Sequence, residues 1–461
     1  MFGRIVDIKV KPFSPPPGTN ELASLYAAIR HKPYAMLLLS GGDLDCAGYS
    51  LMGWDPFLVL RSQGELVHLQ GAGDQGRRGN PFTILEEALE ALKLPGEAPL
   101  LPLTAGGLGF LAYDLKNHLE KLPQTARDDL KLPELVLAFP RRLLVHDRRG
   151  GKFWEVQLIH EDARGRQTGA ATEAIAWGAA TPLGPYQVGP LASNFTREAY
   201  LKAITRIREY IRQGDVYQVN LAQRFSFSFT GEAYALFRRL FQLNPAPFYA
   251  FLHCGDFQVL STSMERFLYR RGNYLETRPI KGTRPRGATP EEDDALRREL
   301  VESRKDDAEL SMIVDLLRND LGKVCTPRSV RVAEHRRLEA YQNVYHSVSI
   351  VTGQVRPEVS QVDILRASFP GGSITGCPKI RAMEIIDELE PHVRHVYCGA
   401  IGYLGLHGNL DLNVAIRTAI IAHGRAHFAV GGGIVYDSRE EDEYDETLHK
   451  GRTLFKVIEG S

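Results

Sequence analysis

Apolar residues recur at helical spacing in the segment between Thr196 and Gly214. Threonine is a favourable N-cap residue, and glycine commonly follows the last turn of a helix. The pattern therefore predicts an amphipathic helix capped by these two residues. The side chains on its apolar stripe would be Tyr200, Ala203, Ile204, Ile207 and Ile211.

A second pattern, strict alternation of apolar and polar residues, runs from Leu410 to Ile420. Successive side chains of a strand point to opposite faces, so the alternation predicts one long strand with a buried face and a wet face. The buried face would carry Leu410, Leu412, Val414 and Ile416, and the wet face Asp411, Asn413 and Arg417.

The arrangement of such segments along the chain indicates the fold class. Strands and helices mix without the regular strand–helix rhythm of a doubly wound sheet. We expect an α+β fold in which helices flank large, mainly antiparallel sheets. Proline and glycine gather in residues 181–190 and mark a boundary or long connection. It would separate an N-terminal region, 1–185, from a second region, 195–456.

Composition narrows the class of protein. The 461 residues include 56 Lys and Arg and 56 Asp and Glu, a balance that gives no broad basic surface for nucleic acid or anionic membrane. No apolar run approaches the ~18 residues of a spanning helix, and the first residues do not resemble a signal peptide. The five cysteines form no CxxC pair, which excludes a structural zinc cluster. We expect a cytoplasmic enzyme that binds neither nucleic acid nor membrane.

Two acidic pairs are candidates for a metal site. Asp306 and Glu309 open one predicted helix, and Glu443 and Glu446 open another, with Lys450 one turn further on. Residues three apart share a helix face. Carboxylates from two helices can hold one Mg²⁺, which prefers oxygen ligands. Acidic pairs at this spacing are also common on solvated helix faces, and spacing alone leaves both interpretations open.

Single residues are ambiguous when each is considered alone. The triple glycine 431–433 indicates either a bulge or a place where a ligand or backbone approaches closely. Lys281 is either a surface charge or an inward-pointing amine. His346, in a predicted strand over 346–351, is either a general base or a satisfied core histidine. Glu265 and Arg417 are equally undecided.

Taken together, several ordered blocks resemble the chorismate-utilising enzyme family, which includes anthranilate, aminodeoxychorismate, isochorismate and salicylate synthases. The resemblance covers about residues 195 to 456 and continues more weakly in the first half at 106–110 and 113–114. The blocks are Gly214-Asp-Val-Tyr-Gln-Val-Asn-Leu221, Arg278-Pro-Ile-Lys-Gly-Thr-Arg284, Met312-Ile-Val-Asp-Leu-Leu-Arg-Asn-Asp320, Pro370-Gly-Gly-Ser-Ile-Thr-Gly-Cys-Pro-Lys379, Gly399-Ala-Ile-Gly-Tyr403 and Gly431-Gly-Gly433.

The resemblance implies a fold of two large antiparallel sheets packed as a layered sandwich with flanking helices. It implies Mg²⁺ held by Glu309 and Glu446, with Asp306 and Glu443 nearby. One departure is Ser263-Met264-Glu265, where the aminating members usually have Ser-Pro-Glu, so we expect a less rigid loop. The residues that match substrate contacts or the active-site histidine of the family are Gln218, Gly282, Thr283, His346, Ser373, Tyr397, Arg417, Gly431, Gly432, Gly433 and Lys450.

Two positions favour one reaction within the family. The members that add water use a lysine base where this chain has Gln218, and an amide cannot deprotonate water, so ammonia is the expected nucleophile. Anthranilate synthases usually have alanine at the position of Lys281, whereas lysine marks the aminodeoxychorismate synthases of the para-aminobenzoate branch of folate synthesis.

The expected chemistry is covalent. Lys281 would attack C2 of chorismate and expel the C4 hydroxyl, and ammonia would then enter at C4 and release the lysine. Glu265 is the candidate acid for the departing hydroxyl. No cysteine stands in a glutaminase motif, so the ammonia is expected from a separate glutamine amidotransferase subunit. The alternatives are an anthranilate synthase and an inactive binding module.

Overall fold

A computed structural model of the chain describes residues 2–19, 21–71, 74–94, 101–162, 165, 167–168, 175–177 and 182–459. Thr181, the first residue of the predicted boundary, lies outside these ranges. Within them no helix is long and apolar enough to cross a bilayer.

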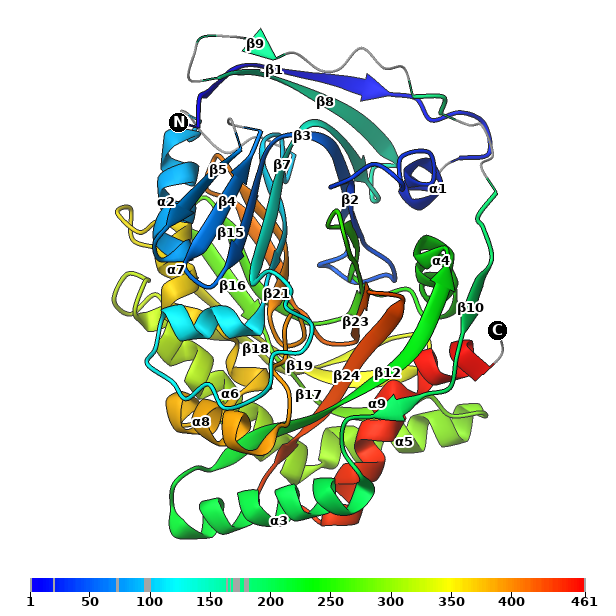
Figure 1. Cartoon of the computed structure of the whole chain (residues 1–461). Helices are drawn as coiled ribbons and strands as arrows, with labels where there is room; N and C mark the ends of the chain where they lie inside the picture. The colour runs from blue at the N-terminus through cyan, green and yellow to red at the C-terminus, as the bar shows by residue number, and fades with distance from the viewer. Residues whose placement is uncertain are drawn as a thin grey trace.

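The described strands range from 2 to 15 residues in length and are named as in Figure 1. In chain order they are β1 (Arg4–Phe13), β2 (Met36–Leu39), β3 (Tyr49–Gln63), β4 (Leu66–Gln70), β5 (Gln75–Arg78), β6 (Gly106–Leu111), β7 (Leu135–Asp147), β8 (Lys152–Glu161), β9 (Gln167–Thr168), β10 (Tyr186–Val188), β11 (Ala192–Ser193), β12 (Gln218–Gly231), β13 (Phe248–His253), β14 (Gln258–Ser263), β15 (Arg266–Arg271), β16 (Tyr274–Arg278), β17 (Ile280–Pro285), β18 (Arg331–Ala340), β19 (Val344–Gln354), β20 (Gly376–Cys377), β21 (Ala400–Gly405), β22 (Leu410–Val414), β23 (Thr418–Ala422) and β24 (Arg425–Ile434).

The described helices lie on the outside of the strands (Figure 1). The α-helices are α1 (Leu22–Tyr26), α2 (Pro81–Ala91), α3 (Arg197–Gln213), α4 (Ala233–Leu243), α5 (Pro290–Glu302), α6 (Arg304–Gly322), α7 (Gln361–Ser368), α8 (Lys379–Leu389) and α9 (Glu440–Glu459), and the 3₁₀ turns are η1 (Tyr113–His118) and η2 (Gly372–Ile374). The predicted helix is confirmed as α3, because Thr196 accepts a hydrogen bond from the Ala199 amide and Gly214 adopts a left-handed φ of 84°.

All strands that the structure describes belong to one hydrogen-bonded network. The network has two arms that start from the central pair β3 and β7. The first arm runs through β3, β2, β13, β14, β23, β24 and β12. The second arm runs through β7, β6, β21, β22, β15, β16 and β19. The expected α+β class and antiparallel pairing are confirmed, and the two expected sheets are the two arms of this one network.

Two prolines explain where the arms separate. Pro56 in β3 faces Pro140 in β7, and the register between the strands shifts immediately after this pair. Proline has no amide hydrogen to donate to a ladder, so it is tolerated where pairing is interrupted. On either side of this point β3 exchanges one neighbour, β2, for another, β4. Such breaks are how a strand passes from one sheet direction to another.

The predicted strand 410–420 is wrong as a single element. It forms β22 and β23, and between them Arg417 has a positive φ of 52°. The reason is tertiary, because β22 pairs within the second arm and β23 within the first, so the chain must turn where it crosses between them. The wet face is nevertheless present, since Asp411 and Asn413 line a cavity.

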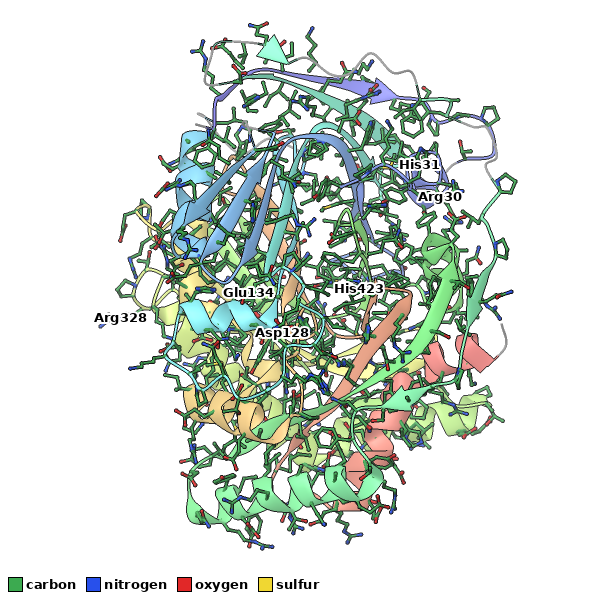
Figure 2. All side chains as sticks on the ribbon, in the orientation of Figure 1. Arg30, His31, Asp128, Glu134, Arg328 and His423 are labelled. Carbon is green, nitrogen blue, oxygen red and sulfur yellow. The ribbon has the colours of Figure 1, made fainter. Side chains whose placement is uncertain are left out.

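The first and second halves of the chain are joined directly. Strand β2 pairs with β13, and β6 pairs with β21. Ion pairs reinforce the join: Arg30, which follows α1 and is labelled in Figure 2, pairs with Glu232 ahead of α4. The first half therefore forms part of the same scaffold as the region 195–456.

Candidate active site

The site lies where the far ends of the two arms meet, between β12 and β24 of the first arm and β17 and β19 of the second. At Gly433, in β24, side chains from β12 and β17 come close to the backbone. A Cβ atom on this residue would lie 2.1 Å from Gln218 Nε2 and 3.1 Å from Lys281 Nζ. The register of β12 with β24 is uninterrupted, so the triple glycine forms no bulge there. The bulge is therefore wrong at this place. The side chains of Gln218 and Lys281 approach the backbone of Gly433, and the expected approach of a ligand stays a prediction.

Lys281 is presented by an irregularity in β17. The pairing of β17 with β19 shifts between Lys281 and Thr283, and Gly282 between them has a φ of +79°, which favours glycine. A Cβ on Gly282 would approach the Asp306 carboxyl carbon to 3.0 Å. The turn thus brings Lys281 close to helix α6. Its half-buried amine is near enough to the carboxyls of Glu265, Glu309 and Glu446 to affect the pKa of each.

Glu265 is a buried carboxyl between β14 and β15, with only 4% of its surface exposed. Burial raises its pKa to about 7, against the opposing effects of a hydrogen bond from Ser373 and the charge of Lys281. The Ser373 hydroxyl donates to Glu265 Oε1 at 2.6 Å. The Glu265 carbonyl also accepts a bond from the Val414 amide. A carboxyl with a pKa near neutrality is suited to both donating and accepting a proton.

Two acidic helices face this region, as predicted. Ser303 caps α6 by accepting from the Asp306 amide. The apolar stripe of α6 is buried and consists of Leu310, Ile313, Val314, Leu317 and Leu321. Helix α9 lies along β24 (Figure 1). A Cβ on Gly432 would lie 3.4 Å from a Glu443 oxygen and 3.7 Å from a Glu446 oxygen. The second acidic pair therefore converges on the triple glycine.

The carboxyl chemistry fits a small hard cation. Burial raises the pKa of Glu309 and of Glu443, which means that their charged forms are poorly compensated in the protein alone. Glu446 differs, because Lys450 lies 2.6 Å away and lowers its pKa. Among the described residues no three His, Cys, Asp or Glu side chains gather tightly enough to enclose a metal. Mg²⁺ does not require this, since it commonly takes one or two carboxylates and completes its shell with water and substrate oxygens.

A cationic side of the site is formed around Lys450. Its amine donates to the Gly431 carbonyl at 2.9 Å, and its own carbonyl accepts a hydrogen bond from Arg417. Tyr397 is buried and Arg417 is half-buried in this region, and the tyrosine is near enough to affect the pKa of the arginine. These groups are of the type that binds carboxylates.

His346 is buried and neutral. Burial lowers its pKa to about 3, Nδ1 lies 2.9 Å from the Thr283 hydroxyl, and the ring contacts Tyr341 edge-on at 5.2 Å. Its Nε2 atom has no hydrogen-bond partner among the described residues. The structure therefore places this histidine beside Gly282 and leaves one ring nitrogen available.

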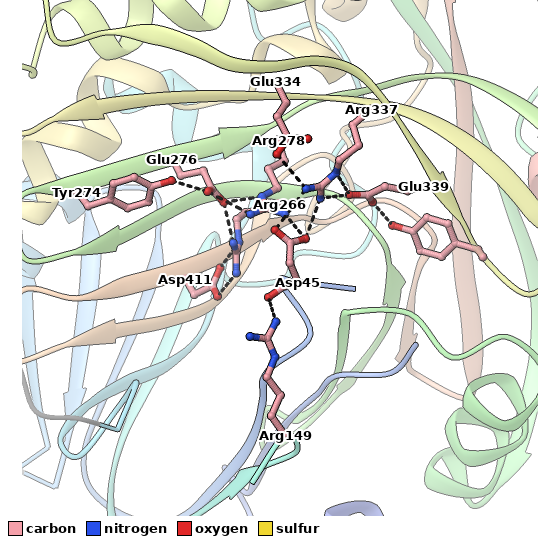
Figure 3. A network of polar contacts seen from close by, with 11 residues as sticks. Asp45, Arg149, Arg266, Tyr274, Glu276, Arg278, Glu334, Arg337, Glu339 and Asp411 are labelled. Atoms are coloured by element: carbon pink, nitrogen blue, oxygen red, sulfur yellow. Dashed lines mark hydrogen bonds and ion pairs between the residues drawn. The ribbon is translucent and has the colours of Figure 1, made fainter. Parts of the chain in front are cut away.

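A sizeable cavity lies apart from these residues. Its volume is about 420 Å³, and it is lined from both halves of the chain, including Asp45, Arg149 and Asp411. A network of ion pairs crosses its wall (Figure 3), in which Asp45 bonds to Arg278 and Arg337. None of the predicted site residues lines this cavity.

The structure brings the predicted residues from ten separate segments into one site, and it adds two that sequence reasoning missed. Ser438 donates to Glu443 at 2.6 Å, and Lys305 lies 3.8 Å from the same carboxyl. Lys305 directly precedes Asp306 in the chain, and this adjacency is the sequence signal that points to it. Ser438, in the turn before α9, carried no comparable signal.

Known proteins resemble the chain over most of its length. Residues 44–456 match the family described as chorismate binding enzyme. Aminodeoxychorismate synthase component 1 of Escherichia coli is 39% identical over 441 residues, covering 94% of this chain and 95% of the relative. Anthranilate synthase component 1 of Pseudomonas putida is 38% identical over 455 residues, covering 94% and 92%.

A solved structure agrees with these sequence matches. Anthranilate synthase component I from Streptococcus pneumoniae superposes with a TM-score of 0.77 at 31% identity, covering 89% of this chain and 93% of the other. The shared fold, the length of the sequence matches and the clustered site residues lead to one conclusion: the chain belongs to the chorismate-binding enzyme family and is an enzyme that acts on chorismate.

Proposed function

We propose that this enzyme aminates chorismate at C4 and forms 4-amino-4-deoxychorismate for para-aminobenzoate and folate synthesis. The observation that carries the proposal is the position of the Lys281 amine. It lies beside Gly433 and is near enough to the Glu265 carboxyl to affect its pKa. An amine and a near-neutral acid in one buried site are the two groups that a covalent C4 substitution needs.

The reaction divides into two allylic displacements. The neutral Lys281 amine forms a bond to C2, both conjugated ring double bonds shift along the ring, and the C4 hydroxyl leaves as water with a proton from Glu265. Ammonia then bonds to C4, the two double bonds shift back, and the C2–nitrogen bond to Lys281 breaks. Glu265 accepts the proton that the ammonia nitrogen loses. The balance is chorismate and ammonia in, aminodeoxychorismate and water out.

The two carboxylates of chorismate require positive partners. Arg417, Lys450 and Tyr397 are proposed to bind the enolpyruvyl carboxylate, and the backbone of Gly431–Gly433 leaves room for the substrate because it carries no side chains. Glu309 and Glu446 are proposed to hold Mg²⁺, with Asp306 and Glu443 close by. The ion would neutralise the ring carboxylate when it is bound.

Gln218 is proposed to favour ammonia over water. Its amide is buried, its Nε2 has no partner among the described residues, and it faces Gly433. An amide can hydrogen-bond to a bound nucleophile and cannot deprotonate water. The ammonia is proposed to come from glutamine through a separate amidotransferase subunit, consistent with the "component 1" in the names of the relatives.

The product decides the proposal. Purified enzyme, chorismate, Mg²⁺ and an ammonium salt should yield a product with the mass of aminodeoxychorismate, detected by liquid chromatography and mass spectrometry. Fluorescent anthranilate as the main product would instead assign the chain to C2 amination, the activity named for its relative from P. putida.

A further inference from the structure

Arg394 is one of the most buried charged residues near the site, with a side chain only 3% exposed. It precedes β21 and forms a double ion pair with Glu390, through Nε at 2.9 Å and Nη2 at 2.6 Å. Its guanidinium also lies over the rings of Tyr113 and Tyr397, 4.9 and 5.9 Å from their centres. A buried ion pair is a weak source of stability, which leaves the reason for this arrangement open.

The remaining donors of the guanidinium reach two backbone carbonyls from distant parts of the chain. Nη1 donates to the Ile374 carbonyl at 2.9 Å, and Nη2 donates to the Asn220 carbonyl at 2.8 Å. The partner carboxylate continues the link, because Glu390 accepts from the Ala222 amide at 2.9 Å. Four of the five N–H groups of an arginine are thereby used in one fixed plane.

Each carbonyl belongs to a segment that carries a site residue. Ile374 directly follows Ser373, whose hydroxyl donates to Glu265. Asn220 lies opposite Gly433 in the ladder of β12 with β24, two residues after Gln218. The third contact is Tyr397 itself. One side chain thus connects the donor to Glu265, the wall formed by Gln218 and Gly433, and the buried tyrosine.

We infer that Arg394 is a positioning residue for the reaction of this enzyme: it fixes the Ser373 turn and the β12 wall relative to each other, and so sets the hydrogen bond that Ser373 makes to Glu265. The inference rests on the activity toward chorismate and on the role proposed for Glu265. It does not depend on whether nitrogen enters at C4 or at C2.

The test is the pH dependence of chorismate consumption at saturating ammonium in Arg394→Lys. Lysine keeps the charge and cannot reach both carbonyls and Glu390 in one plane. We expect kcat to fall about tenfold or more, since small displacements of catalytic groups are costly, with a much smaller change in KM. The Ser373 bond lowers the pKa of Glu265, so its loss should raise that pKa. The limb of the pH–rate profile on which activity falls as Glu265 loses its proton should therefore move to higher pH.

Ser373→Ala and the double variant identify the route of the effect. Ser373→Ala should move the same limb in the same direction, and adding Arg394→Lys should move it no further, because both changes remove one interaction. A limb that stays in place in Arg394→Lys, or shifts that add in the double variant, would overturn the inference. The matched control is Arg142→Lys, since Arg142 also pairs with a buried glutamate, Glu155, and lies over Trp54 at 5.0 Å. It should leave the pH profile unchanged.

A second variant answers the case in which Arg394→Lys does not fold. Arg394→Met combined with Glu390→Gln removes both buried charges, a change that proteins often tolerate, and keeps an acceptor for the Ala222 amide. With folding verified by circular dichroism, the same loss of kcat and the same shift of the limb are expected. Wild-type kcat and an unmoved limb in this variant would refute the positioning role. The product mass, measured in the same reactions, tests the C4 proposal separately.

Discussion

At the scale of single residues, the site depends on a carboxyl and an amine whose surroundings change their acid–base behaviour. Glu265 has a raised pKa because it is buried, and the partners that oppose this effect, Ser373 and Lys281, do not fully offset it. It is therefore partly protonated near neutral pH, where a solvent-exposed glutamate would be fully charged.

Glu265→Gln should lower kcat by about 10²–10⁴-fold and remove the limb on which activity falls as pH rises through about 7. The reason is that glutamine cannot donate a proton to the departing hydroxyl. A pH–rate profile of both proteins measures this. The window between pH 6 and pH 8 follows from the raised pKa of Glu265. A wild-type profile that is flat in this window would contradict the role of Glu265 as the acid, and so would a variant that retains the limb.

The same residue makes a prediction about stability. A raised carboxyl pKa means that the stability contributed by the neutral form is present below the ordinary value of 4.5 and is lost as pH rises through about 7. Glu265→Gln should therefore melt at a higher temperature than the wild type at pH 8, with a smaller or no difference at pH 5. Scanning calorimetry at both pH values tests this without reference to activity.

Lys281→Ala should lose aminodeoxychorismate formation by on the order of a hundredfold or more, because it removes the nucleophile and leaves the carboxylate sites in place. Residual turnover is expected to shift to amination at C2. Trapping with chorismate should give a mass adduct on the wild type that the variant lacks. Near wild-type formation of the 4-amino product by the variant would leave Lys281 only an electrostatic role.

At the scale of elements, two helices from opposite ends of the catalytic half present their acidic faces to one place. Glu309 comes from α6 and Glu446 from α9. Burial raises the pKa of Glu309, and the charge of Glu446 is near enough to raise it further. The apolar stripe of α6 fixes which of its faces points inward, and the ladder of β24 fixes the position of Gly432 beneath α9.

Glu309→Gln and Glu446→Gln should each raise the Mg²⁺ concentration needed for half-maximal activity, by roughly tenfold or more, because each removes a formal charge from the proposed cation site. Titration of Mg²⁺ into metal-free enzyme measures this. Asp315→Asn is the matched control on α6, since that side chain is 70% exposed and pairs with a surface arginine one turn away. Full activity of both glutamine variants at micromolar Mg²⁺ would remove these residues from the metal site.

At the scale of the whole molecule, the chain is expected to use ammonium salts alone and to need a second protein for glutamine. The five cysteines among the described residues are mostly buried, and burial raises the pKa of Cys46 to about 12 and of Cys398 to about 12. Buried thiols with raised pKa values are poor nucleophiles. Release of glutamate from glutamine by the purified single chain would contradict the expectation.

The sequence by itself determined the local elements and the chemical inventory. Thr196 and Gly214 end their helix as predicted because capping is a property of neighbouring residues, and the stripe of α6 is buried because its spacing matches a helix turn. The ordered blocks identified the family, because the residues expected to bind chorismate and react with it occur in them in a fixed order along the chain.

Only the tertiary structure decided which of these residues meet. The strand predicted over 410–420 divides because its two parts join different arms, a constraint that no local pattern contains. The triple glycine is a close approach, because Gln218 and Lys281 arrive there from other strands. Arg394 showed nothing unusual in the sequence, since its partners are backbone carbonyls at Ile374 and Asn220, and a carbonyl has the same chemistry at every residue.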